Sequence, residues 1–583
     1  MHTTNKAWAV SASQLLQKTW LNILVVTAFF CLKLLLDDNM GGANEVDVLP
    51  LARQYADPNW IPDDWYLNQP PSYRMLFQAL FGKLAASWGF LATSLIGRLF
   101  CYTLISSGLV LIARQINLSL PLLLLALGLF LYLYPEQGIA AGEWIAKGLE
   151  SKSIAYGFLL LAIAFMLQHR YRWMALLLGL SSSFHILVGG WAFVAVGGWL
   201  FLRRKKDFTV QLLASILLIY LAGSAFAVPS ILQQLLTPNP PTAIKPSYIY
   251  VFLRLPHHLN PLSWHSGWWL KPLAYLIVLA ISVWLLKRHK KQEPQYSACI
   301  ELATFTLITL VPFILGLLVA PFDSQGILLQ YYPFRLGDVM LPLNTCLLFA
   351  CAIEQTLNKT ARKAKNRARH SVEVPPNGKF FKKGLLLVCI LILSSMCIPQ
   401  TVRFRHQLLA LQQFPSASQG VDPEWKAMCA WVRTHTPKNA VVVSPPVEFE
   451  NFTWLTQRPT IAKFKLLPQT KAGIVTWYER LADLSGNAWS NSTSRKDNRQ
   501  KLTTGYNNLT TAQAKNLMIK YQADYFVTRI AHKLDLAIAY HNSLYILYTK
   551  PDLGRGGEGE RGSQLSMNNE QLSMNNEQLI IDN

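Results

Sequence analysis

Long apolar runs separated by short polar segments dominate the first 400 residues of this chain. An α-helix needs about 20 apolar residues to cross the roughly 30 Å hydrocarbon core of a bilayer. The pattern predicts eleven membrane-spanning helices, at 19–36, 91–113, 118–135, 154–168, 173–187, 188–202, 209–228, 269–286, 299–320, 337–355 and 384–400. The two runs within 173–202 are short, so a re-entrant hairpin would also fit them. The stretch 76–90 is more polar, and we expect it to form an amphipathic helix in the membrane interface.

After residue 400 the pattern changes to short helix and strand signals in alternation. The predicted elements are a helix at Pro423–His435, a strand at Ala440–Val443, a helix from Thr510 or Thr511 to Lys520, and a strand at Tyr525–Thr528. Such alternation is typical of a small α/β domain with a partly parallel sheet. We therefore expect three parts: a transmembrane domain at 1–400, an α/β domain at 401–550 and a disordered tail at 551–583. The tail carries the heptad Gln-Leu-Ser-Met-Asn-Asn-Glu twice in succession.

Composition supports a membrane protein. Of the 583 residues, 51% are hydrophobic and only 15% are charged, whereas soluble domains carry about 25% charged residues. The fold class predicted is thus an α-helical polytopic membrane protein of about eleven spans with a small extracytoplasmic α/β domain.

The net charge of +22 raises the question of a nucleic-acid partner. If the N-terminus is cytoplasmic, the inner segments hold 22 basic residues against three acids, and acids outnumber bases in the outer loops. This is the asymmetry of the positive-inside rule. We therefore predict a bacterial inner-membrane protein with a periplasmic C-terminal domain. Its basic loops face anionic lipid headgroups, and no nucleic acid is expected as a partner.

The first outer loop, 37–75, contains seven acids. Its most site-like segment is Asn44–Pro50, where Glu45 and Asp47 would share one face of an extended strand. Asp38, beside Asp37, is a further candidate. A carboxylate at the membrane face could take a proton or hold a divalent metal such as Mg²⁺ or Mn²⁺. The alternative is a solvated acidic loop with no chemical role.

Basic and histidine side chains gather in the other outer loops. The candidates for substrate binding are Lys152, His185, Arg254, His257, His258 and Arg335. Arginine is suited to bidentate phosphate binding. The alternatives are salt bridges at helix ends, hydrogen-bonded packing of the histidine, and interfacial anchoring of the arginines.

Carboxylates and cations at one membrane face suit transfer from a lipid-linked phosphate donor. The cations would stabilise the leaving phosphate, and the carboxylate would deprotonate an acceptor hydroxyl. The layout resembles the GT-C class of integral membrane glycosyltransferases, which have an acidic first outer loop with the catalytic aspartate and an interfacial helix in that loop. Shorter pieces resemble uncharacterised multi-pass proteins of cyanobacteria, known only as a domain of unknown function. These pieces are Gly142-Glu143-Trp144, Glu150-Ser151-Lys152, Ser183-Phe184-His185, Arg254–His258 and Tyr332–Arg335.

The resulting hypothesis is a glycosyltransferase that takes a sugar from a polyprenyl-phosphate donor at the periplasmic face. Asp47 would be the base, with Glu45 or Asp38 as second carboxylate, and Arg254 and Arg335 would hold the phosphate. A transporter or lipid flippase is the main alternative, and a non-catalytic scaffold with an extracytoplasmic binding domain is another.

Overall fold

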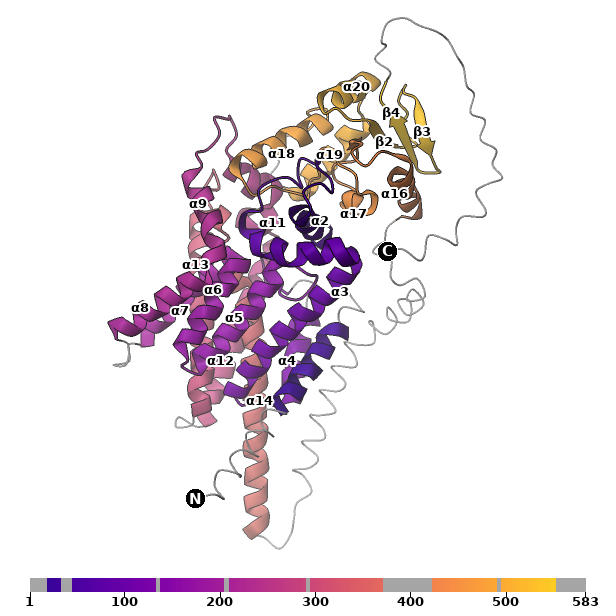
Figure 1. Ribbon diagram of the computed structural model, residues 1–583. Helices are drawn as coiled ribbons and strands as arrows, with labels where there is room; N and C mark the ends of the chain where they lie inside the picture. Colours follow the sequence, from indigo (N-terminus) through magenta and orange to yellow (C-terminus); the bar gives the residue numbers. More distant parts are fainter. Residues whose placement is uncertain are drawn as a thin grey trace, which may run out of the picture.

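The computed structural model describes residues 18–32, 44–132, 137–203, 209–289, 294–370, 422–489 and 494–551. Apolar helices form a bundle, and a smaller α/β domain covers one end of it (Figure 1). The predicted span 384–400 and most of the predicted tail lie outside the described residues.

The bundle contains helices of very different lengths. They are a helix at Lys18–Leu32, α3 (Met75–Gln115), α4 (Leu120–Tyr132), α5 (Ser151–Leu167), α6 (Tyr171–Phe184), α7 (Ile186–Arg203), α8 (Val210–Gly223), α9 (Val228–Leu236), α12 (Leu270–His289), α13 (Pro294–Val319) and α14 (Arg335–His370). Within the described residues, five are long and apolar enough to cross a bilayer, or six if α8 and α9 count as one span bent by 56°. The chain is therefore a helical membrane protein by length and composition, and the number eleven stays a prediction.

α3 joins two segments that the sequence pattern separated. Gly89 interrupts the helix with a φ of 75°, a backbone conformation that glycine adopts without a steric penalty. The part before Gly89 packs against α2 (Glu45–Ala56), and a Cβ at Gly82 would lie only 2.1 Å from the Ala52 carbonyl oxygen. The predicted boundary between 76–90 and 91–113 is therefore present as a kink.

Short helical turns connect the long helices at the end of the bundle below the α/β domain. They are η1 (Ser72–Arg74), η2 (Ala225–Ala227), α10 (Pro246–Tyr248), η3 (Ile249–Arg254), α11 (Pro256–Leu259), η4 (Pro261–Ser263), η5 (Ser266–Trp269) and η6 (Leu329–Tyr331). Several start at proline, which has no N–H to leave unpaired in a first turn.

The C-terminal domain comprises α16 (Pro423–His435), β1 (Val442–Val443), α17 (Phe452–Thr456), α18 (Lys471–Leu484), α19 (Arg495–Asn507), α20 (Thr511–Lys520), β2 (Tyr525–Arg529), β3 (Ile538–His541) and β4 (Tyr545–Thr549). Its sheet has the order β1-β2-β4-β3, with β1 and β2 parallel and the other pairs antiparallel. The predicted partly parallel sheet is confirmed. Thr510 caps α20 through a capping box with Gln513.

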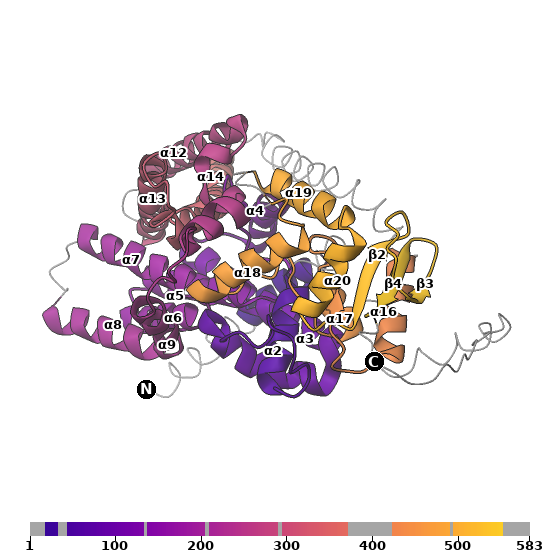
Figure 2. The same ribbon diagram turned by 90° about the horizontal axis from the view of Figure 1, so that it is seen from above.

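Hydrogen bonds join this domain to the bundle. Thr460 N–H donates to Asp64 at 3.1 Å, and the Asn498 amide donates to the Leu253 carbonyl at 3.1 Å. Seen from above, α18 and α19 lie over the bundle end (Figure 2). The C-terminal domain therefore covers the connecting turns, and we call it the roof.

A fully buried ion pair ties together three segments under this roof. The Arg98 guanidinium of α3 binds Glu45 of α2 with two hydrogen bonds, of 2.6 and 2.8 Å. Glu45 also accepts the Leu149 N–H at 2.7 Å. Both side chains have no exposed surface, so each charge depends on the other for compensation.

We expect Arg98→Met to lower the free energy of unfolding by about 3–5 kcal/mol, because the buried Glu45 carboxylate would lose its ion-pair partner. Thermal or denaturant unfolding in detergent measures the change. Arg172→Met is the matched control, since Arg172 is exposed, and it should leave stability nearly unchanged. Equal losses in the two variants would contradict this role of the pair.

Candidate functional site

A polar cavity of about 290 Å³ lies between the connecting turns of the bundle and the C-terminal domain. Among the described residues, seven basic side chains line it: Arg74, Lys147, Lys152, Arg254, Arg335, Lys465 and Arg495. The acids in its lining are Asp47 and Glu150. Its other polar or aromatic residues include Asn44, Trp144, His185, Tyr250, His257, His258, Tyr332 and Gln469. We call this hollow the polar cavity.

Among the described acids of the first outer loop, Asp47 lines the polar cavity. It lies in the first turn of α2, and its carboxylate accepts hydrogen bonds from the Tyr66 hydroxyl and, at 3.1 Å, from the Arg74 guanidinium. The side chain is held in place by two donors and still has lone pairs for a ligand, because a carboxylate offers about four acceptor positions.

The other two carboxylate candidates have different positions. Glu45 is not in the cavity lining. Its carboxylate accepts hydrogen bonds from the Arg98 guanidinium and the Leu149 N–H instead. The expectation that Glu45 and Asp47 share a face of an extended strand is wrong, because α2 is helical and residues two apart point to different sides. Asp38 lies outside the described residues.

Segment 137–150 presents charged groups to the cavity and is held by the first turn of α14. Asp338 accepts the backbone N–H groups of Ala140, Ala141 and Glu143 at 2.7–2.9 Å. A Cβ at Gly138 would lie 2.0 Å from the Asp338 carboxylate, so the close approach requires glycine.

Glu143 lies between two of the predicted phosphate-binding cations. Its carboxylate is 2.9 Å from the Lys152 ammonium and 3.3 Å from the Arg335 guanidinium. Burial alone would raise the pKa of Glu143, but the charges of Arg335 and Lys152 lower it below its usual value. Glu143 is thus ionised at neutral pH, and it fixes both cations at the cavity wall.

His185 separates α6 from α7. Its backbone is extended, with φ of −154° and ψ of 100°, so the predicted pair of spans is interrupted here. The Arg335 guanidinium donates to the His185 ring nitrogen Nε2 at 2.8 Å. His185 therefore acts as a hydrogen-bond acceptor that orients Arg335 toward the cavity.

Arg254 and the two following histidines enter from the turn η3–α11. η3 is a π-helix, a rare form that is frequent at functional sites. His258 donates from Nδ1 to the Ala141 carbonyl, and burial lowers its pKa to about 4. Burial, and to a smaller extent the neighbouring His258 ring, also lower the pKa of His257. Both rings are neutral at pH 7, so they add polarity to the cavity and no charge.

The structure therefore brings Asp47, Lys152, His185, Arg254, His257, His258 and Arg335 around one cavity. Their chemical roles stay predictions. Among the basic residues of the described lining, the sequence analysis did not propose Arg74, Lys147, Lys465 and Arg495 as site residues. Arg74 had a signal, as a base at the end of an acidic outer loop, but the two C-terminal residues had none, since only the docking of the roof brings them here.

A second hollow of about 250 Å³ adjoins the polar cavity and shares His185, Tyr250, Tyr332, Arg335 and Gln469 with it. Its remaining wall is more apolar and includes Ile186 and Leu187 of α7 and Ile231 and Leu235 of α9. Leu235 is 71% exposed. The polar cavity thus continues into an apolar surface beside the long helices.

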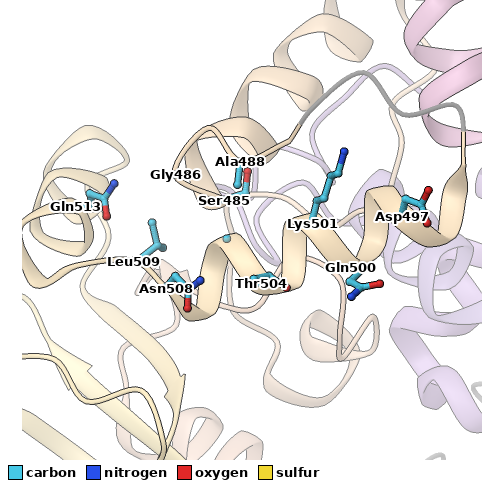
Figure 3. A pocket seen from close by; sticks show the side chains of 11 residues that line it. Ser485, Gly486, Ala488, Asp497, Gln500, Lys501, Thr504, Asn508, Leu509 and Gln513 are labelled. Atoms are coloured by element: carbon cyan, nitrogen blue, oxygen red, sulfur yellow. The ribbon is translucent and has the colours of Figure 1, made fainter.

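A third hollow, of about 470 Å³, lies within the C-terminal domain (Figure 3). It is formed by α19, the turn Ser485–Ala488 and Gln513 of α20. Its lining is mostly uncharged, with one acid and one base, Asp497 and Lys501. We regard it as secondary to the polar cavity because it gathers none of the predicted residues.

In the part of the chain that the structure describes, no three His, Cys, Asp or Glu side chains are grouped to hold a metal ion. A site for Mg²⁺ or Mn²⁺ therefore stays a prediction.

A comparison with known protein families gives a match over part of the C-terminal domain. The model of a family described as a domain of unknown function, DUF6798, matches residues 423–484, which extend from α16 to α18. No curated protein matches the chain. The match includes Lys465 and Gln469, two cavity residues of the roof. It agrees with the expectation of a domain of unknown function and gives no support to a GT-C relationship.

We expect Asp338→Asn to loosen segment 137–150, because an amide N–H₂ would face one of the backbone N–H groups that the carboxylate accepts. Hydrogen exchange should become faster at Ala140–Glu143. Asp323→Asn is a matched control: Asp323 accepts N–H groups from Ile327, Leu328 and Leu329, so its effect should stay near those residues. Unchanged protection in Asp338→Asn would contradict the role.

Proposed function

We propose that this protein is an integral membrane glycosyltransferase that takes a sugar from a polyprenyl-phosphate donor. The observation that carries the proposal is the polar cavity at one end of the apolar bundle, where Asp47 and seven basic side chains of the described residues share the lining. Clustered arginines and lysines suit a phosphate, which they bind with charge-assisted hydrogen bonds. A lipid-linked donor would explain why such a cavity lies beside membrane helices.

The adjoining apolar hollow supports a lipid as the carrier of the phosphate. It shares Arg335 with the polar cavity and extends to Leu235, an exposed leucine of α9. A headgroup bound by Arg335 could therefore place its isoprenoid chain along α9 and α7. Apolar surface buried this way contributes about 25 cal/mol per Å².

The proposed reaction needs one base and one stabilised leaving group. The acceptor hydroxyl oxygen forms a bond to the anomeric carbon, and its proton passes to the Asp47 carboxylate. The bond between the anomeric carbon and the phosphate oxygen breaks, and its electron pair leaves with the lipid phosphate. Arg254 and Arg335 would stabilise the charge on this phosphate. Glu45, which binds Arg98, would position α2 and take no proton.

Helix directions support a periplasmic site in a bacterial inner membrane. α3, α5 and α7 all lead away from the cavity end, and the bases Arg114, Arg170 and Arg203 follow at their far ends. The positive-inside rule would put these bases in the cytoplasm. The cavity and the C-terminal domain would then face the periplasm.

A lipid flippase is the second candidate. The bend of 56° between α8 and α9 and the interruption at His185 are breaks of the kind found in transporters. A flippase would move the lipid phosphate across the bilayer without breaking the sugar–phosphate bond.

We expect Asp47→Asn to reduce kcat for transfer from a polyprenyl-phosphate sugar by about 10²–10⁴, the usual contribution of a general base. The assay uses the full chain in proteoliposomes with labelled donor. Donor binding should be kept, because Lys152 and Arg335 are held by Glu143 and not by Asp47.

Asp57→Asn is the matched control, since Asp57 is an exposed acid of the same loop, and it should retain full activity. Undiminished transfer in Asp47→Asn would rule out Asp47 as the base. Donor translocation with no transfer by the wild type would favour the flippase, and neither activity would favour a scaffold.

A further inference from the structure

We infer that the loop between α13 and α14, residues 320–334, is a membrane anchor whose exposed apolar side chains insert among the lipids. The side chains concerned are Phe322, Ile327 and Leu328. The anchor places the surface of the bilayer at the mouth of the apolar hollow beside the polar cavity. This role does not depend on the reaction at the polar cavity, because it concerns how this end of the bundle meets the membrane.

The loop exposes large apolar side chains and no charge. Phe322 is 85% exposed, Leu328 56% and Ile327 50%. Contiguous exposed apolar surface marks an interaction site more often than it occurs by chance. Between Ala320 and Phe334 the one charged residue is Asp323, and its side chain is buried. The exposed part of the loop therefore carries no charge that would make its entry into lipid costly.

Hydrogen bonds within the loop hold these side chains outward. The Asp323 carboxylate accepts three backbone N–H groups, those of residues 327–329, at 2.8–2.9 Å. The loop could bury Ile327 and Leu328 only by breaking these hydrogen bonds, which would leave a buried carboxylate without its donors. Their exposure is thus fixed by the fold of the loop.

The loop is also tied to the turns that precede Arg254. The Ser247 hydroxyl of α10 donates to the Gln325 carbonyl at 2.7 Å. Gly326 has a φ of 70°, and a Cβ there would lie 2.8 Å from the side chain of Val251 in η3. The anchor therefore holds one wall of the polar cavity at a defined depth relative to the bilayer.

The exposed side of the loop continues the exposed side of α13, a helix long and apolar enough to cross a bilayer. One face of α13 exposes apolar residues at helical spacing: Leu307, Val311, Ile314, Leu315 and Leu318. Phe322 follows Leu318 by four residues, and its N–H donates to the Val319 carbonyl at 2.9 Å. It therefore extends the same face by one turn, and lipid that covers this face of α13 also reaches Phe322.

A second exposed apolar surface at the same end of the bundle is α9, all nine residues of which are at least partly exposed. Leu235 and Leu236 are 71% and 77% exposed. Seen from above, α9 and α13 lie at different places on the margin of the bundle, with α7 between them (Figure 2). A single protein partner would cover one patch, whereas lipid surrounds the whole margin. Lipid is therefore the occupant that suits both surfaces.

The two surfaces meet at the apolar hollow. Ile231 and Leu235 of α9 line it, as do Gln330 and Tyr331 near the end of the loop. The Trp191 indole of α7 donates to the Tyr331 carbonyl at 2.8 Å, which fixes this part of the loop to the bundle. The hollow therefore opens where lipid headgroups meet the acyl chains, and a ligand can enter it from the bilayer.

The test measures the surroundings of a label at position 322. Phe322→Cys is labelled with a nitrobenzoxadiazole fluorophore, and the full chain is placed in phosphatidylcholine nanodiscs. Two quenchers are compared: a phosphatidylcholine with a nitroxide near the top of its acyl chain, and aqueous iodide. Interfacial side chains lie about 5–10 Å into the boundary between headgroups and acyl chains. The nitroxide should therefore quench this label severalfold more strongly than the same label at position 519, and iodide should quench it severalfold less.

Ile519→Cys is the matched control, because Ile519 is a 54% exposed apolar residue of α20, in the roof above the bundle (Figure 1). Leu318→Cys, on the exposed face of α13, is the reference for lipid contact, and wild-type protein gives the background from the native cysteines. Leu328→Cys takes the place of Phe322→Cys if that variant does not fold.

Iodide quenching at position 322 as strong as at position 519 would overturn the inference, because the loop would then lie in water. Weak quenching by both reagents would overturn it as well, because a second copy of the protein or another segment of the chain would then cover the loop.

Discussion

Positive charges gathered in a partly buried space repel one another, and the bundle end is built under this constraint. Three arginines of the bundle end are each held by a specific carboxylate: Arg98 by Glu45, Arg74 by Asp47, and Arg335 by Glu143. Removing one partner of such a pair is more harmful than the pair is favourable. The acids of this end therefore compensate the arginine charges and also hold α2, α3, α14 and segment 137–150 in position.

Backbone hydrogen bonds also fix the segment that carries Glu143. Asp338 fixes segment 137–150 through three backbone N–H groups, so Glu143 is presented at a defined place. The roof then adds Lys465 and Arg495 to the lining. Basic side chains from the two parts of the chain therefore meet at the cavity.

Much of this could be predicted from the sequence. The apolar runs located the long helices α12, α13 and α14, and Gly89 falls at the predicted boundary in α3. Charge asymmetry and residue types led to Asp47, Arg254 and Arg335. The expected shared face of Glu45 and Asp47 was wrong, because the analysis assumed an extended strand where the chain forms the helix α2. Lys465 and Arg495 could not be predicted, since no local pattern reports how a domain docks.

The central claim is that the polar cavity holds the phosphate of a lipid. The most direct measurement is a cryo-electron microscopy map of the full chain in nanodiscs containing polyprenyl phosphate. The account predicts phosphate density within hydrogen-bond distance of Arg335 or Arg254, with the isoprenoid chain running toward α9. Headgroup density bound elsewhere on the protein, with the cavity filled only by water, would contradict it.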